Sequence, residues 1–324
     1  MTPNLDIGPG LIWGFDFSNG ESREMNRCDA AYSSGFRWLH LNLADHGTRR
    51  WIEQAEMLPP PVRELFLSAD NHQRALVDGD TMGCVLHDFE RDFDTTNTAR
   101  VGVLRVALTP TLILTTRMHP LHWADIARQK LYAGTTIGPA AALDLLVGII
   151  TQHVAEISRT LTVDVQAAED AFLEGHHPPT IRDLIAIRRR LAQLHRLLDG
   201  MRGVFHRLEE DEDLPEHLLP TVEKLSQRLQ ALDGDIMGIQ GQLRLLRDEL
   251  DIQAAQRTNQ NLYILSIMTA LMLPATLVTG IFGMNTSGLP LAEGHWGTFY
   301  ATMIAASAAI ATWLLLRWMG FMRR

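Results

Sequence analysis

Apolar residues are arranged in two different ways along this 324-residue chain. Near the C-terminus they form two runs of 21 residues without a charge, Leu262–Phe282 and Trp296–Leu316. As a helix, each run is long enough to cross a hydrocarbon core of about 30 Å. Helices buried in a soluble core are usually shorter and carry a polar stripe. The two runs therefore predict a pair of membrane-spanning helices.

Before the first run, apolar residues recur every three or four positions, which is the spacing of one helix face. This seam comprises Leu225, Leu229, Leu232, Ile236, Ile239, Leu243, Leu246 and Leu250. Thr221 can cap the helix at its start. The next proline, Pro274, lies inside the first uncharged run, where neighbouring helices make proline tolerable. The pattern predicts one helix of roughly 96 Å from Thr221 to about Met284.

A second heptad phase occupies a different face of the same predicted helix, and its residues are small, polar or of modest size. It comprises Gly234, Gly238, Gly241, Asp248, Asn259, Leu262, Thr269, Leu273, Thr276 and Gly280. Small residues allow helices to pack closely in a membrane. In a symmetric ring of helices, the same face would line a narrow axial passage. The pattern alone leaves both interpretations open.

The N-terminal part has the strand and turn signals of an α/β domain. Helices are predicted over Thr48–Glu56 and Pro60–Leu67, and strands over Leu11–Phe17, Trp38–Leu43, Thr81–Phe89, Val101–Leu108 and Thr111–Thr116. From about Gly138 to Leu208 the pattern is helical, with a turn at 175–179 and Thr180 as the next N-cap. The predicted fold class is an α/β domain followed by a long helix and two C-terminal spans.

Charge and cysteine content narrow the classes of function. The formal net charge of −9 lies mostly before residue 258 and argues against nucleic acid as a partner. Met1–Gly10 has neither a basic region nor a long apolar run, so no cleavable signal is expected. Cys28 and Cys84 lack metal-type spacing and are expected to be free thiols in a reducing compartment.

Basic residues flank the two apolar runs on one side only. They are Arg244, Arg247 and Arg257 before the first run, and Arg317, Arg323 and Arg324 after the second. The connector at 283–295 contains no lysine or arginine. The positive-inside rule therefore predicts that both termini are cytoplasmic and that the connector faces outward.

The first run ends in Gly280-Ile281-Phe282-Gly283-Met284-Asn285. A Gly-Met-Asn tripeptide at this place in a C-terminal helix pair resembles the signature of the CorA family of divalent-cation transporters. The resemblance covers the whole architecture and implies a homopentamer in the bacterial inner membrane, with Gly283, Met284 and Asn285 at the outer pore mouth. It implies a CorA-like fold with a cytoplasmic α/β funnel domain at 1–260, a pore-lining span at 261–284, a periplasmic loop at 285–296, a second span at 297–317 and a cytoplasmic tail at 318–324.

The family's pore positions, matched by distance from Asn285, all fall in the second heptad phase. They are Asp248, Asn259, Leu262, Leu273 and Thr276, and Thr269 and Gly280 continue the same line. Leu273 and Leu262 are expected to form hydrophobic constrictions, and Asp248 a carboxylate ring that concentrates cations. Five Asn285 amides are expected to hold the hydration shell of an arriving ion rather than strip it.

The identity of the ion is predicted from two short segments. Within the family, Trp38-Leu39-His40-Leu41 and the connector Thr286–Leu291 are similar to the ZntB branch of zinc transporters. Glu293 is the only acid in the connector, and His295 supplies an imidazole, which suits zinc and is a poor ligand for magnesium. The expected substrate is Zn²⁺, with magnesium, cobalt or nickel as the alternative. Candidate ligands are Asn285, His295, Glu293 and Asp248.

Proton-coupled uptake is implied by the zinc branch, yet neither apolar run contains Asp, Glu, His, Lys or Arg. Coupled protons would therefore titrate at Glu293, His295 or Asp248, or move along pore water. A membrane-tethered sensor or scaffold is the rival class of function. A tether does not need a polar face through the membrane, and this chain has one.

Features of a metal enzyme or an ATPase are absent from the sequence. His119 and His122 are three positions apart and His176 adjoins His177, but no HExxH, CxxC, Cys-His cluster or Gly-rich phosphate loop accompanies them. We expect no enzymatic activity, no cofactor, and mostly structural or surface roles for the 13 histidines. The predicted partners are divalent cations, membrane lipid and further copies of the chain.

Overall fold

The computed structural model describes residues 10–18, 21–25, 35–91, 100–134, 137–174, 179–284 and 296–319. The chain forms two compact units, Met1–Leu246 and Arg247–Arg324. Helix α6, Leu219–Gly283, contributes residues to both units. The predicted long helix is thus confirmed, and it begins two residues earlier than its expected cap.

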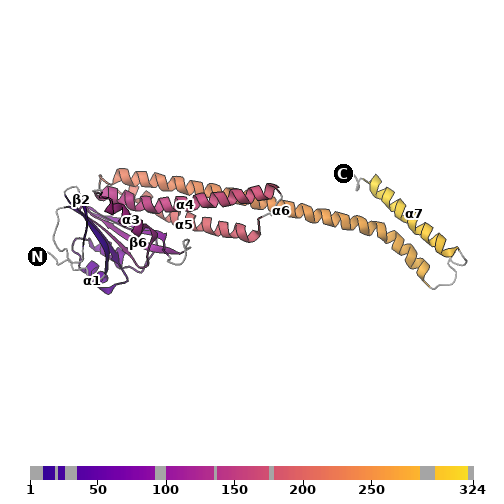
Figure 1. Ribbon diagram of the computed structural model, residues 1–324, viewed down its shortest axis with the longest axis horizontal. Helices are drawn as coiled ribbons and strands as arrows, with labels where there is room; N and C mark the ends of the chain where they lie inside the picture. Colours follow the sequence, from indigo (N-terminus) through magenta and orange to yellow (C-terminus); the bar gives the residue numbers. More distant parts are fainter. Residues whose placement is uncertain are drawn as a thin grey trace. The chain divides into compact units, whose positions relative to one another are not determined.

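The first unit contains a mixed sheet of seven described strands (Figure 1). Five of its six neighbouring pairs are antiparallel, and the pair of β3 and β7 is parallel. The sheet order is β2-β1-β3-β7-β6-β5-β4. The bounds are β1 Leu11–Ser18, β2 Glu21–Glu24, β3 Phe36–Asn42, β4 Arg74–Asp78, β5 Thr81–Phe89, β6 Val101–Leu108 and β7 Leu112–Arg117.

Alternation along β3 separates the two faces of the sheet. Leu39 and Leu41 belong to a core cluster built with residues of α1 (His46–Gln54) and α2 (Pro60–Leu67). Trp38 and His40 point to the other face, where both rings contact Trp123 of α3 (His122–Tyr132). Helices therefore cover both faces of the sheet.

His40 belongs to the segment that resembles the zinc branch, and it is fully buried in this core. Its Nδ1 lies 3.0 Å from Thr115 Oγ1. Burial, with a smaller contribution from the positive charge of Arg117, holds the pKa of His40 well below its usual value. The histidine is therefore a neutral core residue.

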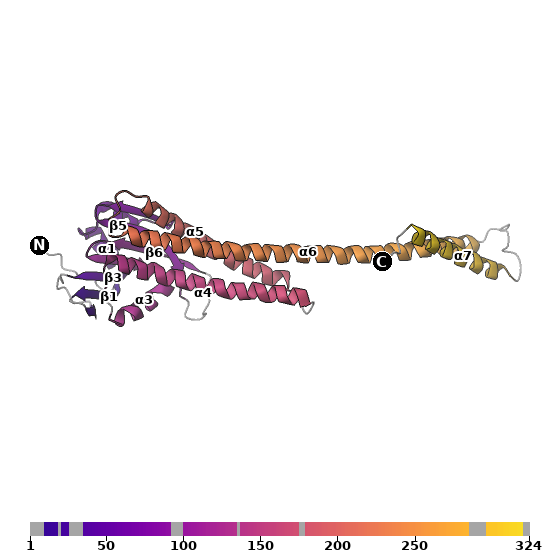
Figure 2. The ribbon, with the colours of Figure 1, turned by 90° about the horizontal axis from the view of Figure 1, so that it is seen from above.

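Helices α4 (Pro139–Glu174) and α5 (Ile181–Glu209) run beside the first part of α6 within this unit (Figures 1 and 2). The predicted apolar seam of α6 is buried from Leu225 to Leu246, and only Leu250 is half-buried. Polar contacts join the same helices: Asp233 of α6 accepts from His195 of α5 at 2.6 Å. The predicted cap of α5 is confirmed as a capping box between Thr180 and Asp183.

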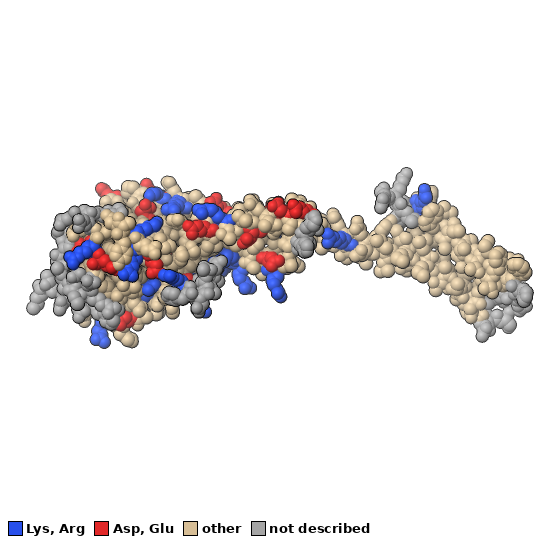
Figure 3. Space-filling view, in the orientation of Figure 1, with Lys and Arg blue, Asp and Glu red and all other residues tan. Residues whose placement is uncertain are grey.

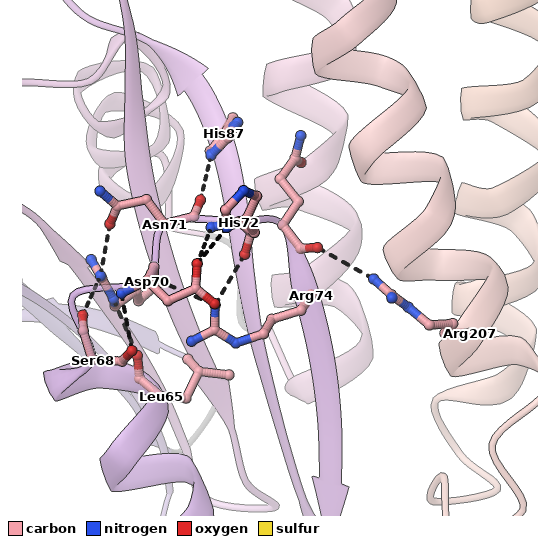
Figure 4. A network of polar contacts seen from close by, with 10 residues as sticks. Leu65, Ser68, Asp70, Asn71, His72, Arg74, His87 and Arg207 are labelled. Atoms are coloured by element: carbon pink, nitrogen blue, oxygen red, sulfur yellow. Dashed lines mark hydrogen bonds and ion pairs between the residues drawn. The ribbon is translucent and has the colours of Figure 1, made fainter.

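The loop between α2 and β4 attaches the sheet to α5 (Figure 4). The side-chain amide of Gln73 donates to the Leu197 carbonyl at 3.1 Å, and Arg207 donates to the Gln73 carbonyl at 3.3 Å. A Cβ at Gly200 would collide with the Gln73 amide, so only glycine lets the loop approach this closely. Arg105 fixes the loop from the sheet side by donating to the Ser68 carbonyl.

Three elements of this unit were not predicted from the sequence. Strand β2 is a short, charged edge strand, and every residue of the edge strand β4 is half-buried, so neither has an alternating pattern. Helix α3 lacks a capping side chain of its own. Cys84 is a buried free thiol, as expected, and burial raises its pKa to about 12. Cys28 lies outside the described residues.

Candidate ion pathway

Three described helices are long and apolar enough to cross a membrane, but they differ in burial. In α4, 44% of the most apolar 18-residue stretch is buried within the first unit, as in a helix that packs on a core. The corresponding stretches are 0% buried in α6 and 6% buried in α7, Gly297–Trp318. Exposed apolar surface of this extent favours contact with lipid. Charged side chains gather over the first unit instead (Figure 3).

Aromatic side chains mark both ends of α7. Trp296, Phe299 and Tyr300 lie at its start, with neighbouring ring centroids 5.9 and 6.1 Å apart. Trp313 and Trp318 lie near its end. The helix has 22 residues and is therefore about 33 Å long, close to the thickness of a hydrocarbon core. Trp and Tyr are enriched at the two membrane interfaces, so this spacing fits a span.

The two apolar helices of the second unit each have one less exposed face. On α7 this face is made almost entirely of small residues: Gly297, Ala301, Ala305, Ala308, Ala309, Thr312 and Leu316. On α6 the half-buried residues are Ile267, Ala270, Leu271, Pro274, Ala275, Val278 and Phe282. Small residues let membrane helices approach closely. On α7 the small residues recur at a spacing of four, which is visible in the sequence. This repeat was not predicted from the sequence to be a helix-packing face.

The opposite face of α6 is uncovered in the single chain, and it carries the predicted pathway residues. Thr269, Leu273, Thr276 and Gly280 are all exposed. A shallow groove of about 430 Å³ lies along this face. Its lining combines four predicted positions with two that were not predicted: Leu273, Thr276, Gly280 and Met284 with Leu277 and Ile281.

The threonines of this face have a fixed hydroxyl orientation. Thr276 Oγ1 donates to the Met272 carbonyl at 2.8 Å, and Thr269 Oγ1 donates to the Leu265 carbonyl at 2.8 Å. Because each hydroxyl proton is engaged by the backbone, the two lone pairs of each oxygen remain available as acceptors. This face therefore offers hydrogen-bond acceptors without any charge.

Towards the first unit, the same heptad phase continues through Leu262, Asn259 and Asp248, all of which are exposed. Arg247 pairs within its own helix with Asp251 at 3.9 Å and leaves the neighbouring Asp248 carboxylate on the open surface. Pro274 is the proline inside α6, and its ring removes the hydrogen bond that residue 274 would donate to the Ala270 carbonyl.

Part of the predicted site lies outside the described residues. Gly283 ends α6 and Met284 follows it with an exposed side chain, but Asn285, Glu293 and His295 are among the residues that the structure does not describe. Within the described ranges, no group of three or more His, Cys, Asp or Glu side chains is arranged to hold a metal ion. Apart from the Asp248 carboxylate, the described part of the candidate pathway is thus a neutral surface of hydrogen-bond acceptors and apolar side chains.

Comparison with protein families identifies the class. The family described as CorA-like Mg²⁺ transporter protein matches residues 33–319, so the chain belongs to this family of divalent-cation transporters. Its curated relatives include the zinc transport protein ZntB of Yersinia pestis, which is 28% identical over 293 residues and 86% of each chain. The ZntB of Enterobacter sp. (strain 638) is 25% identical over 319 residues and 94% of each chain.

Solved structures share the fold at lower identity. The full-length CmaX protein has a TM-score of 0.78 at 22% identity and covers 95% of this chain and 97% of its own. The CorA magnesium transporter of Methanocaldococcus jannaschii has a TM-score of 0.76 at 17% identity, with 94% and 96% covered. The ZntB cytoplasmic domain of Vibrio parahaemolyticus has a TM-score of 0.63 at 15% identity, with 76% and 99% covered. The predicted CorA-like fold is confirmed.

Proposed function

We propose that this chain carries Zn²⁺ across the bacterial inner membrane through the axial pore of a homopentamer. The observation that carries the proposal is the open face of α6, where Thr269, Leu273 and Thr276 remain exposed while the other face is half-buried. The first unit would form a cytoplasmic funnel, and both termini would lie in the cytoplasm. A membrane tether would have no use for this face.

The chemistry of the face suits a hydrated divalent cation. Water molecules bound to such an ion direct their hydrogens outward, so a passage for the hydrated ion needs acceptors. Thr276 and Thr269 supply oxygen lone pairs because their own protons are donated to the backbone. Neutral acceptors bind such a hydration shell without holding the ion tightly, and conduction requires that the ion can leave. Leu273 and Leu262 would supply the dewetting constrictions.

Zinc is preferred over magnesium, cobalt or nickel on two grounds. The curated relatives with 25–28% identity are named zinc transport proteins. The outer connector contains one imidazole, His295, and imidazole is a good ligand for zinc and a poor one for magnesium. A CorA-type magnesium, cobalt or nickel channel is the second candidate, supported by the name of the matching family.

Flux through proteoliposomes containing the purified full-length protein tests the proposal. Zn²⁺ and Mg²⁺ uptake would be compared with and without a pH gradient, in the parent and in Asn285→Ala. We expect a folded Asn285→Ala oligomer with little flux, because the amide ring at the mouth is lost. Ser287→Ala, two residues further along the connector, is the matched control and should transport normally. Flux at the parental rate in a correctly inserted Asn285→Ala protein would refute the assignment of Asn285 to the pore mouth.

Ion choice has a separate test at His295. Replacement by alanine should lower the ratio of Zn²⁺ to Mg²⁺ flux and flatten the dependence on external pH. Only the neutral imidazole binds zinc. Because its ordinary pKa is about 6.5, zinc binding should weaken as the external pH falls below that value. Proton-driven uptake would change with external acidity in the opposite direction, so the sign of the parental pH profile distinguishes the two effects. An unchanged ratio and profile would favour the magnesium-type channel.

A further inference from the structure

Two histidines that the ion pathway does not use meet in the first unit. His122 is the first residue of α3 and His153 lies in the middle of α4. Their ring centroids are 3.7 Å apart and their planes differ by 26°. Both side chains are half-buried, and the sequence spacing of His119 and His122 gave no indication of this pair.

Each ring is held in place by the surrounding fold. The Asp88 carboxylate on β5 accepts from the backbone N–H of Trp123 at 2.9 Å and so fixes the start of α3, where His122 lies. Phe89 packs edge-on against the His153 ring, with centroids 5.7 Å apart. The pair therefore belongs to a preorganised region in which strand β5 positions both helices.

Charged groups around the pair have mixed signs. Glu156 follows His153 by one helical turn and favours the protonated form of both rings, whereas Arg91 and Arg190 oppose it. Burial outweighs these charges: it lowers the pKa of His122 and lowers the pKa of His153 to about 4. Both imidazoles are neutral near pH 7, and neutral imidazole is the form that binds metal.

We propose that His122 and His153 form a binding site for a divalent transition-metal ion, separate from the ion pathway. Two zinc–nitrogen bonds of roughly 2.0–2.1 Å require ligand nitrogens no more than about 4.2 Å apart. The ring centroids are 3.7 Å apart, so both rings lie within reach of one ion, and each must turn out of the stack so that the in-plane lone pair of a nitrogen points at that ion. Imidazole suits zinc, copper and nickel, whereas magnesium prefers oxygen ligands. The site would therefore distinguish transition metals from magnesium.

The ligand set is completed by water and by Glu156. In the structure Glu156 Oε1 accepts a hydrogen bond from Gln152 Nε2 at 3.3 Å. A change of rotamer would bring the carboxylate towards the metal, since residues three apart share a helix face. With two fixed ligands the site is expected to bind reversibly. An ion bound there would link α3 to α4. Metal binding would therefore restrain the position of these two helices relative to each other.

The number of bound imidazoles is the decisive measurement. The full-length protein in detergent would receive one equivalent of Cu²⁺ per chain, and pulsed electron paramagnetic resonance would count the coordinated imidazoles. We expect a two-imidazole signal that is lost in His122→Phe and in His153→Phe, which keep a stacked ring but remove its nitrogens. His119→Gln, on the exposed segment before α3, is the matched control and should leave the signal unchanged.

Zinc affinity gives a second readout, measured by competition with a chromophoric chelator. Loss of even an outer-shell partner weakens metal sites about 10–100-fold, so loss of either ring should weaken zinc binding by at least about 10-fold. Glu156→Gln should weaken it less and keep the two-imidazole signal. The proposal is overturned if well-folded Phe variants keep that signal or bind zinc within about twofold of the parent. Both readouts are independent of flux and of Asn285, so the site and the proposed transport fail separately.

Discussion

Replacing Gly234, Gly238 and Gly241 by alanine should stabilise the single chain and weaken its assembly. The three glycines lie on the exposed face of α6, and an added Cβ at each would meet no heavy atom within 4 Å. Glycine in a helix interior is about 0.8–1.0 kcal/mol less favourable than alanine. The three together therefore destabilise the isolated helix by about 2.5–3 kcal/mol. No contact among the described residues offsets this cost.

The proposed homopentamer supplies a reason for the glycines. They share the heptad phase of Asp248 and Thr276, so in a symmetric ring their backbones would approach neighbouring copies or the axis. Adding methyl groups at a close contact typically costs about 1–3 kcal/mol. Because every subunit would carry three new methyl groups, the penalty on assembly should exceed the gain in helix propensity.

Two measurements on the triple alanine variant separate these effects. Native mass spectrometry in detergent should show dissociation to smaller species at concentrations where the parent remains assembled. Thermal unfolding of the dissociated chain should shift upward. Gly203→Ala in α5 is the matched control, because a Cβ there also meets nothing within 4 Å and the position lies outside the heptad phase. A triple variant that keeps its oligomeric state on dilution would refute the assignment of this face to an interface.

Three further predictions concern other parts of the chain. Leu229→Ala in the buried seam should cost about 2–5 kcal/mol of unfolding free energy, whereas the exposed Leu173→Ala should cost little, as measured by denaturant unfolding of the first unit. The lowered pKa of His40 means that the unfolded chain binds the proton more tightly, so stability should fall below about pH 6.5 by up to about 1.4 kcal/mol per pH unit, and His40→Asn should flatten that slope. In a cysteine-free background, Thr276→Cys should react with aqueous thiol reagents and cross-link between subunits, whereas Val278→Cys, half-buried on the other face, should not; equal labelling would mean that the pore face is wrong.

The features that the sequence predicted are those whose signals are local and periodic. The seam of α6 repeats over several heptads, and Thr180 with Asp183 forms a capping box within four residues. The start of α3 was missed because its capping carboxylate, Asp88, lies on a strand 35 positions away. A contact over that distance leaves no trace in a pattern read along the chain.

The candidate pathway was predicted only as a line along one helix. A heptad phase picks out Leu273, Thr276 and Gly280, but the groove on this face is wider and includes Leu277 and Ile281. The width of the groove depends on the side-chain conformations on successive turns. A periodic pattern in the sequence does not specify these conformations. The histidine pair at α3 and α4 was also inaccessible from spacing, because its members come from two helices.

Pro274 gives α6 an uneven stiffness. A helix resists bending through its ladder of backbone hydrogen bonds, and proline removes one rung and crowds the preceding turn. Because this proline is the one inside α6, flexure of the helix concentrates there. Leu273 precedes it directly and Thr276 follows two positions later. In a ring of such helices, a small change in bend would alter the aperture at these two levels first, with little change elsewhere along the passage.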